Sequence, residues 1–184
     1  HYPAISGDGK YAVFESIANN LTPDDTNASS DIFVREILTG MTTLVSKTPG
    51  GSSGNGDSRR PAINSDGRYI AFGSYASDLV SGDANSAEDV FVWNRTSGSS
   101  QLVSRASDGT QGNDSSGFPH ISGDGRYVVY RSDASNLVPS DTTNFFDIFV
   151  SDVIRGQTSR LSVKGSGAQS NADAYFPYTD GDGS

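Results

Sequence analysis

The chain has 184 residues, a formal net charge of −9 at pH 7 and no cysteine. The acidic balance argues against nucleic acid or an anionic membrane surface as a partner, because both require Lys and Arg to neutralise phosphates. The lack of cysteine excludes disulfides, thiol catalysis and zinc–thiolate sites. No stretch approaches the roughly 18 apolar residues that cross a bilayer, so no membrane insertion is expected.

A proline returns at a constant interval along the whole chain, at Pro3, Pro61, Pro119 and Pro177. A longer phrase returns with it, for example Pro61-Ala-Ile-Asn-Ser-Asp-Gly-Arg-Tyr-Ile-Ala-Phe-Gly-Ser74. A fixed period of this size marks stacked supersecondary units, each of which needs its neighbours to bury an apolar face. We therefore expect repeats over 1–58, 59–116 and 117–174, and the start of a fourth over 175–184.

Four strands are expected in the first repeat, at about 2–6, 10–16, 31–37 and 41–47, with connecting loops near 17–30 and 48–58. These apolar runs are rich in β-branched and aromatic residues and are bounded by turn residues. Asp8-Gly9 between the first two strands predicts a hairpin turn, as do Asp66-Gly67 and Asp124-Gly125. These aspartates are therefore interpreted as turn formers rather than catalytic acids.

Four short strands in a radially repeated unit are typical of a β-propeller blade. The sequence predicts an all-β fold of three four-stranded antiparallel blades plus a terminal extra strand. We expect the packing between blades to use the large side chains inside the strands, namely Phe14, Phe33, Phe72, Phe91, Tyr130 and Phe149.

The repeated phrase, followed by Asp-Ile-Phe-Val at 147–150 and by Leu-Val-Ser at 102–104, resembles the TolB-type, WD-like propeller repeats of bacterial secreted and envelope proteins. The resemblance covers essentially the whole chain, although the Trp-Asp dipeptide of WD repeats is missing and Trp93-Asn94 is its nearest counterpart. It implies a propeller fold and an extracellular or periplasmic location. It says little about function, because such propellers serve many roles.

An acidic loop precedes the third strand of each repeat, with oxygen-bearing side chains at its first, third and seventh positions. These are Asp25, Asn27 and Asp31, then Asp83, Asn85 and Asp89, then Asp141, Thr143 and Asp147. Such spacing suits a structural calcium ion, which takes six to eight oxygen ligands. The alternative is turn chemistry, in which Asp and Asn bond nearby backbone and the last Asp pins the loop to the strand. Because Thr143 replaces Asn, we expect the third site to be the weakest.

No catalytic residues are predicted. The two histidines, His1 and His120, occupy different repeat positions, and no serine lies in a Gly-x-Ser-x-Gly elbow. His120 replaces an alanine of the innermost strand and could face the central channel, although a surface or filler role is favoured. The carboxylates recur at the same phase in every repeat, whereas a catalytic pair needs two different environments.

The sequence thus favours a non-enzymatic binding or scaffold module, secreted or periplasmic, whose ligand is a protein or a glycan. The alternatives are a structural subunit of an extracellular self-assembling array and the accessory propeller of a larger hydrolase. Propellers typically have four to eight blades, so three do not close a ring. We therefore expect either further repeats of a longer chain or self-association to complete the array.

Overall fold

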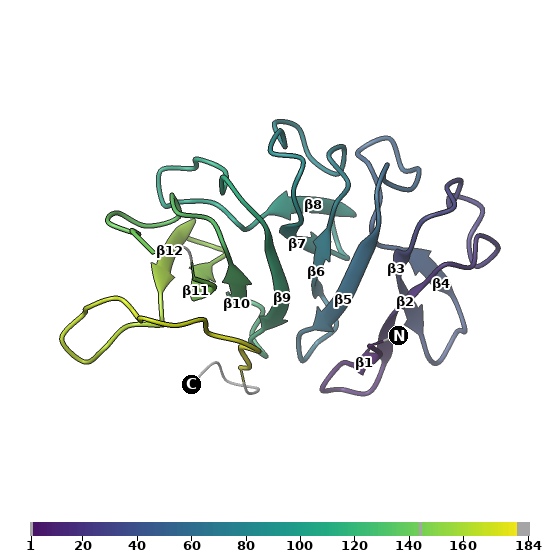
Figure 1. Cartoon of the computed structure of the whole chain (residues 1–184). Coiled ribbons are helices and arrows are strands. Elements are labelled where there is room, and N and C mark those ends of the chain that lie inside the picture. The colour runs from purple at the N-terminus through teal and green to yellow at the C-terminus, as the bar shows by residue number, and fades with distance from the viewer. Residues whose placement is uncertain (1, 144, 180–184) are drawn as a thin grey trace.

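The chain, described over residues 2–143 and 145–179 of a computed structural model, forms three four-stranded antiparallel sheets (Figure 1). The first sheet contains β1 (Ala4–Ile5), β2 (Tyr11–Ser16), β3 (Asp31–Glu36) and β4 (Thr42–Leu44). The second contains β5 (Ser58–Ile63), β6 (Tyr69–Ser74), β7 (Asp89–Asn94) and β8 (Ser99–Leu102). The third contains β9 (Ser116–Ile121), β10 (Tyr127–Ser132), β11 (Asp147–Asp152) and β12 (Gln157–Arg160).

Strand order within each sheet follows the chain, so every connection inside a sheet is a hairpin. The first strands of neighbouring sheets contact one another, β1 with β5 and β5 with β9, and the three sheets fan out from this inner row (Figure 1). This is the arrangement of propeller blades, and it confirms the predicted all-β fold of three four-stranded sheets. The described part of the chain contains no helix, and hence none that could span a bilayer.

The fourth strand of the first sheet is shorter than expected and ends at Leu44. The hydroxyl of Ser46 accepts the N–H of Ile32 at 2.9 Å and so replaces the next backbone carbonyl of the ladder. A serine hydroxyl replaces a backbone carbonyl in the second sheet too, where Ser104 accepts a hydrogen bond from the N–H of Val90 at 3.0 Å. A serine side chain thus ends the ladder at the same point of each repeat.

The core consists of two apolar layers, one on each face of the second sheet. Alternate residues of a strand point to opposite faces, so Phe72 and Phe91 belong to the layer shared with the first sheet, whereas Ala71 and Val90 belong to the layer shared with the third. The central sheet is therefore buried on both sides, while each outer sheet contributes one face to this core.

The predicted aromatic packing is confirmed in the two inter-sheet layers, where Phe72 stacks on Phe91 at 5.8 Å and Tyr130 on Phe149 at 6.0 Å between ring centroids. The corresponding pair of the first sheet, Phe14 and Phe33, also stacks, at 5.9 Å, but belongs to neither layer. Because Val13 points toward the second sheet, its neighbour Phe14 lies on the opposite face.

The Asp-Gly turns form contacts between consecutive repeats as well as hairpins. Gly67 has a φ of +68°, and a Cβ there would lie 2.3 Å from the ring of Tyr11. The guanidinium of Arg95 lies 4.0 Å from the centroid of that ring, and its Nε donates to the carbonyl of Gly67 at 2.9 Å. The tyrosine of one repeat thus packs against the turn of the next. Gly125 approaches Tyr69 equally closely, since a Cβ there would lie 2.4 Å from the Tyr69 ring.

The expected terminal extra strand falls partly on residues outside the described part, and residues 175–179 are not in a strand. Residues 175–179 follow the inner row beside β9 but form no strand, and the remaining residues of the expected fourth repeat lie outside the described part. The inner strands pair with the strand that follows them in the same sheet, as Ala4 pairs with Val13. Within the described part, no such following strand is present to pair with 175–179.

Candidate functional site

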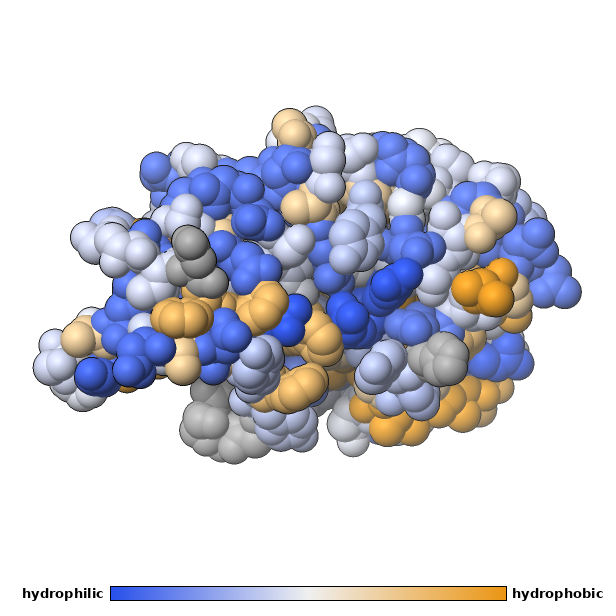
Figure 2. Space-filling view, in the orientation of Figure 1, coloured by the Kyte–Doolittle hydropathy of each residue, from blue (hydrophilic) through white to orange (hydrophobic). Residues whose placement is uncertain are grey.

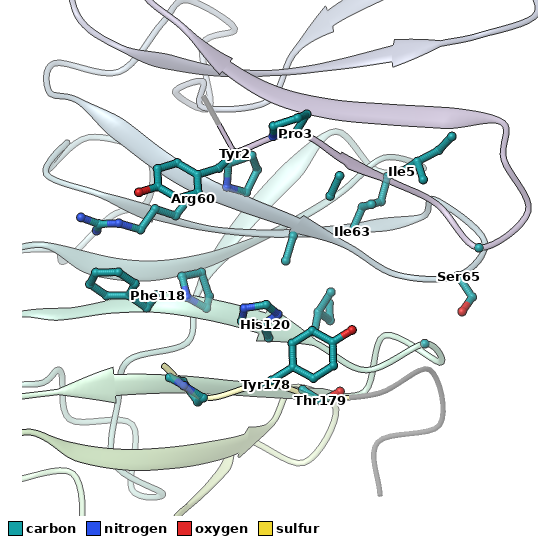
Figure 3. Close-up of a pocket in the computed structure, with 18 of the residues that line it drawn as sticks. Tyr2, Pro3, Ile5, Arg60, Ile63, Ser65, Phe118, His120, Tyr178 and Thr179 are labelled. Carbon is teal, nitrogen blue, oxygen red and sulfur yellow. The ribbon is translucent and has the colours of Figure 1, made fainter. Parts of the chain in front are cut away.

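A pocket of about 710 Å³ lies on the concave side of the inner strand row, between β1, β5, β9 and residues 176–179 (Figure 3). Its walls include the four repeat prolines together with Ile5, Ile63 and Ile121. Arg60 is the one charged side chain among the described residues that line it, and no carboxylate or amide side chain is found among them. We call this hollow the concave pocket.

The residue before each repeat proline lines this pocket and has an unusual backbone. The φ angles are +48° at Tyr2, +54° at Arg60, +55° at Phe118 and +53° at Phe176. Left-handed residues other than glycine are uncommon and carry a cost that surrounding structure must support. In β5 the pairing shifts register between Arg59 and Ala62, which marks a bulge that redirects the side chain. The repeat therefore aims one side chain per blade at the concave side, with different chemistry in each.

Two guanidinium groups contact the ring of Phe118. The Arg60 guanidinium lies 3.9 Å from the ring centroid and that of Arg131 lies 4.6 Å from it. Arg60 also donates from Nη1 to Glu88 Oε1 at 2.9 Å, and its backbone N–H donates to Glu15 Oε2 at 2.9 Å. These contacts hold Arg60 and Phe118 in place before any ligand arrives.

Glu88 is the buried acid of this cluster, and its side chain is only 9% exposed. Burial raises the pKa of Glu88, while Arg60 acts in the opposite direction. Two glycines leave space for the Glu88 carboxylate. A Cβ at Gly73 would lie 2.5 Å from one of its oxygens, and a Cβ at Gly117 would lie 3.0 Å from one. The equivalent repeat positions hold Ser30 and Phe146, so this buried ion pair occurs once and breaks the symmetry of the array.

His120 lines the pocket, and its ring contacts that of Tyr178 edge-on at 5.0 Å (Figure 3). Burial lowers the pKa of His120, which favours the neutral imidazole at pH 7. His120 therefore faces the concave side of the inner strand row, the direction that the channel-facing alternative expects. The informative signal was the replacement of Ala4 and Ala62 by a larger polar ring at an inner-strand position.

The seventh residue of each acidic loop is buried at the start of the third strand of its sheet. Asp31 Oδ1 accepts from the hydroxyl of Ser46 at 2.5 Å, and Asp89 Oδ1 from that of Ser104 at 2.5 Å. Asp147 accepts from Ser162 in the same way. Since these serines also end the ladders, the last Asp of each loop pins it to the sheet. This arrangement supports the turn-chemistry interpretation for these three residues.

The central Asn of the first two loops organises the backbone. Asn27 Nδ2 donates to the carbonyl of Gly54 at 2.8 Å, and its Oδ1 accepts from the N–H of Ser29 at 2.8 Å. Asn85 makes the same pair of bonds with Gly112 and Ala87. Across residues 2–143 and 145–179, no group of three or more Asp, Glu, His or Cys side chains is placed to hold a metal. Calcium at the loops stays a prediction.

The first residue of each loop approaches the seventh. In the second repeat, Gln111 Nε2 donates to Asp83 Oδ1 and to Asp89 Oδ2, both at 2.8 Å. In the third, Gln169 bonds Asp141, Thr143 and Asp147. Arg160 Nη1 also lies 3.1 Å from Asp141 Oδ1 and 3.4 Å from Asp147 Oδ2. Sequence reasoning missed these glutamines because they come from the following loop.

No family model and no curated protein matches the sequence. Among solved structures, TolB from Acinetobacter baumannii matches with a TM-score of 0.54 and 19% identity over 89% of this chain and 32% of that one. Putative TolB from Agrobacterium tumefaciens matches with a TM-score of 0.53 and 21% identity over 85% of this chain and 47% of that one. The propeller domain of the Trilobed protease from Pyrococcus furiosus matches with a TM-score of 0.50 and 15% identity over 86% of this chain and 42% of that one.

The chain therefore spans less than half the length of each of these structures. At these identities the likeness concerns the fold, and it defines the chain as a set of β-propeller blades similar to those of TolB and of protease propeller domains.

Proposed function

We propose that this chain is a non-enzymatic binding module that holds the side chains of a partner protein in the concave pocket. The supporting observation is the set of four equivalent left-handed positions, which present Tyr, Arg, Phe and Phe from the same backbone geometry. Strained backbone that recurs in every repeat, while its side chains differ, is expected where binding uses those side chains. The resemblance to bacterial secreted and envelope propellers supports an extracellular or periplasmic location.

The chemistry of the pocket favours a protein partner over a glycan. Sugar hydroxyls need hydrogen-bonding partners. The described lining offers hydroxyl groups, Arg60 and His120, but it holds no carboxylate and no side-chain amide. Its aromatic rings, isoleucines and prolines instead fit apolar side chains. The prolines also remove backbone donors from the inner strands, which disfavours the addition of a ligand strand. The pocket therefore fits the apolar or aromatic side chains of a partner segment.

Selection of a random peptide library on the immobilised chain, beside a panel of oligosaccharides, tests this proposal. Selected peptides should be rich in aromatic and aliphatic residues, and Tyr178→Ala should lower their affinity about tenfold or more, as at a binding hot spot. The matched control is Leu38→Ala, since Leu38 is 91% exposed and lies outside the pocket. Peptides that bind Tyr178→Ala, Tyr2→Ala and the wild-type chain equally, or binding of oligosaccharides alone, would overturn it.

Self-assembly is a second candidate, supported by the face of the first sheet that points away from the second sheet, where Phe33 is buried but Phe14 is only partly buried. The stacked pair Phe14 and Phe33 lies outside both core layers, and Ile17 on the following loop is 79% exposed. Figure 2 also shows hydrophobic residues at the lower right, on the side of the first sheet. A second copy that covers this face would continue the array of blades. Sedimentation of the wild-type chain should then show a concentration-dependent dimer that Phe14→Ser weakens, and a monomer at all concentrations would exclude it.

A further inference from the structure

The first acidic loop lacks the glutamine that hydrogen-bonds to the carboxylates of the other two loops. Gln111 and Gln169 each place an amide nitrogen between the first and last carboxylates of their loops. The residue at the equivalent position of the first repeat is Ser53, whose side chain is much shorter. The Ser53 hydroxyl accepts the N–H of Thr26 at 3.1 Å and does not bridge the acids.

Two carboxylate oxygens of the first loop consequently have no hydrogen-bond partner. They are Asp25 Oδ1 and Asp31 Oδ2, on residues that are 7% and 0% exposed. They correspond to Asp83 Oδ1 and Asp89 Oδ2, the two oxygens that share the Gln111 amide. A buried charged oxygen without a partner is costly, so buried carboxylates are normally paired or bind metal.

The electrostatic environment is consistent with two acids that face each other. Burial raises the pKa of Asp31 to about 6. The neighbouring charges of Asp25 and Asp57 also raise it, whereas the Ser46 hydroxyl and the nearby Asn27 amide lower it. Burial also raises the pKa of Asp25. A positive charge between the two carboxylates would relieve both effects.

We propose that the first repeat binds one calcium ion between Asp25 Oδ1 and Asp31 Oδ2, at the place that a glutamine amide takes in the other two repeats. That amide nitrogen lies 2.8 Å from both oxygens in the second repeat, close to the 2.3–2.6 Å of calcium–oxygen bonds and well beyond the 2.0–2.1 Å of magnesium. Backbone carbonyls and water complete the shell, which predicts an affinity in the millimolar range of extracellular calcium modules.

Two substitutions, each of which gives one repeat the residue that the other repeat holds at the equivalent position, test this site. Ser53→Gln installs the bridging amide in the first repeat and should abolish calcium binding. Gln111→Ser removes it from the second repeat, frees Asp83 and Asp89, and should add a second equivalent of bound calcium. Both variants alter one polar side chain that is placed beside the acids, and they are matched controls for each other.

The measurements are thermal melting in chelator and in about 10 mM calcium or magnesium chloride, above the expected dissociation constant, with isothermal titration of calcium alone. At a tenfold excess over that constant, the wild-type Tm should rise by about 3–6 °C with calcium, and less with magnesium. Ser53→Gln should melt at the same temperature with and without calcium. Absence of both heat and Tm shift in the wild-type chain would overturn the proposal and leave a shared proton or a buried water between the acids. Retention of the calcium effect in Ser53→Gln would also overturn it, by placing the ion elsewhere.

Discussion

The layers between the sheets and the concave pocket differ in whether equivalent positions of the repeats hold the same side chain. Between the sheets, Phe91 and Phe149 occupy equivalent positions of the second and third repeats, and their stacked pairs have nearly the same geometry. In the pocket, the backbone repeats but the side chain does not, since Tyr2, Arg60 and Phe118 share one φ value within a few degrees. A side chain that recurs in the repeats thus indicates a position that the fold requires. A side chain that varies on a recurring backbone indicates a position that the fold leaves open to ligand binding.

The largest expected effect comes from breaking a repeated position. Phe91→Ala empties a fully buried site in the layer between the first and second sheets and should lower the free energy of unfolding by about 3–5 kcal/mol. Phe14→Ala is the matched control, because Phe14 is only partly buried and lies outside both layers. Urea unfolding of the two variants measures the difference, and an equal loss in both would contradict the assignment of the core.

Gly67 tests the contact between consecutive repeats. Gly67→Ala should cost about 2–4 kcal/mol, because the alanine must adopt a left-handed φ and its Cβ would collide with Tyr11. Gly9→Ala has the same backbone conformation with nothing within 4 Å of the new Cβ, so it should cost only the backbone part, about 1–2 kcal/mol. Equal costs by urea unfolding would show that Tyr11 does not hold the turn.

Asp89 tests what a repeated buried acid contributes as pH changes. Burial raises the pKa of Asp89 to about 6 in the folded chain, from 3.8. The folded state therefore binds this proton more tightly than the unfolded state, and stability should fall as pH rises from about 4 to 6, by about 1–3 kcal/mol. Thermal melts across this range in chelator should show the fall in the wild-type chain and a flatter profile in Asp89→Asn. Parallel profiles would contradict the raised pKa.

The smallest effect on stability is expected in the pocket. Tyr2 and Tyr178 are 63% and 77% exposed, so Tyr2→Ala and Tyr178→Ala should each change the free energy of unfolding by no more than about 0.5 kcal/mol. The same two substitutions should weaken peptide binding. Large destabilisation by either one would assign these rings to the core and remove the contrast with Phe91.

The sheets could be predicted from the sequence because both of their signals are local. The period of the prolines gives the repeat, and short runs such as Tyr69–Ser74 have strand composition over consecutive residues. Residues 175–179 form no strand, since their composition does not supply the neighbouring strand with which an inner strand must pair.

The site was harder to predict because its partners come from different repeats. Glu88 pairs with Arg60 across 28 positions, and Gln111 reaches Asp83 across the same separation, so neither pair forms a motif within one loop. The left-handed backbone at Phe118 was also hidden, because a residue before proline ordinarily prefers an extended conformation. Alignment of the repeats would nevertheless have shown that Glu88, Arg60 and Ser53 depart from their equivalents.

Mapping of backbone amide shifts by NMR, during titration of a selected peptide into the wild-type chain, tests the central claim most directly. The account predicts that the shifts concentrate on the inner row, in β1, β5, β9 and residues 175–179, with Arg60, Phe118 and His120 among the most affected. Shifts confined to the outermost strands β4, β8 and β12, with the inner row unchanged, would contradict it.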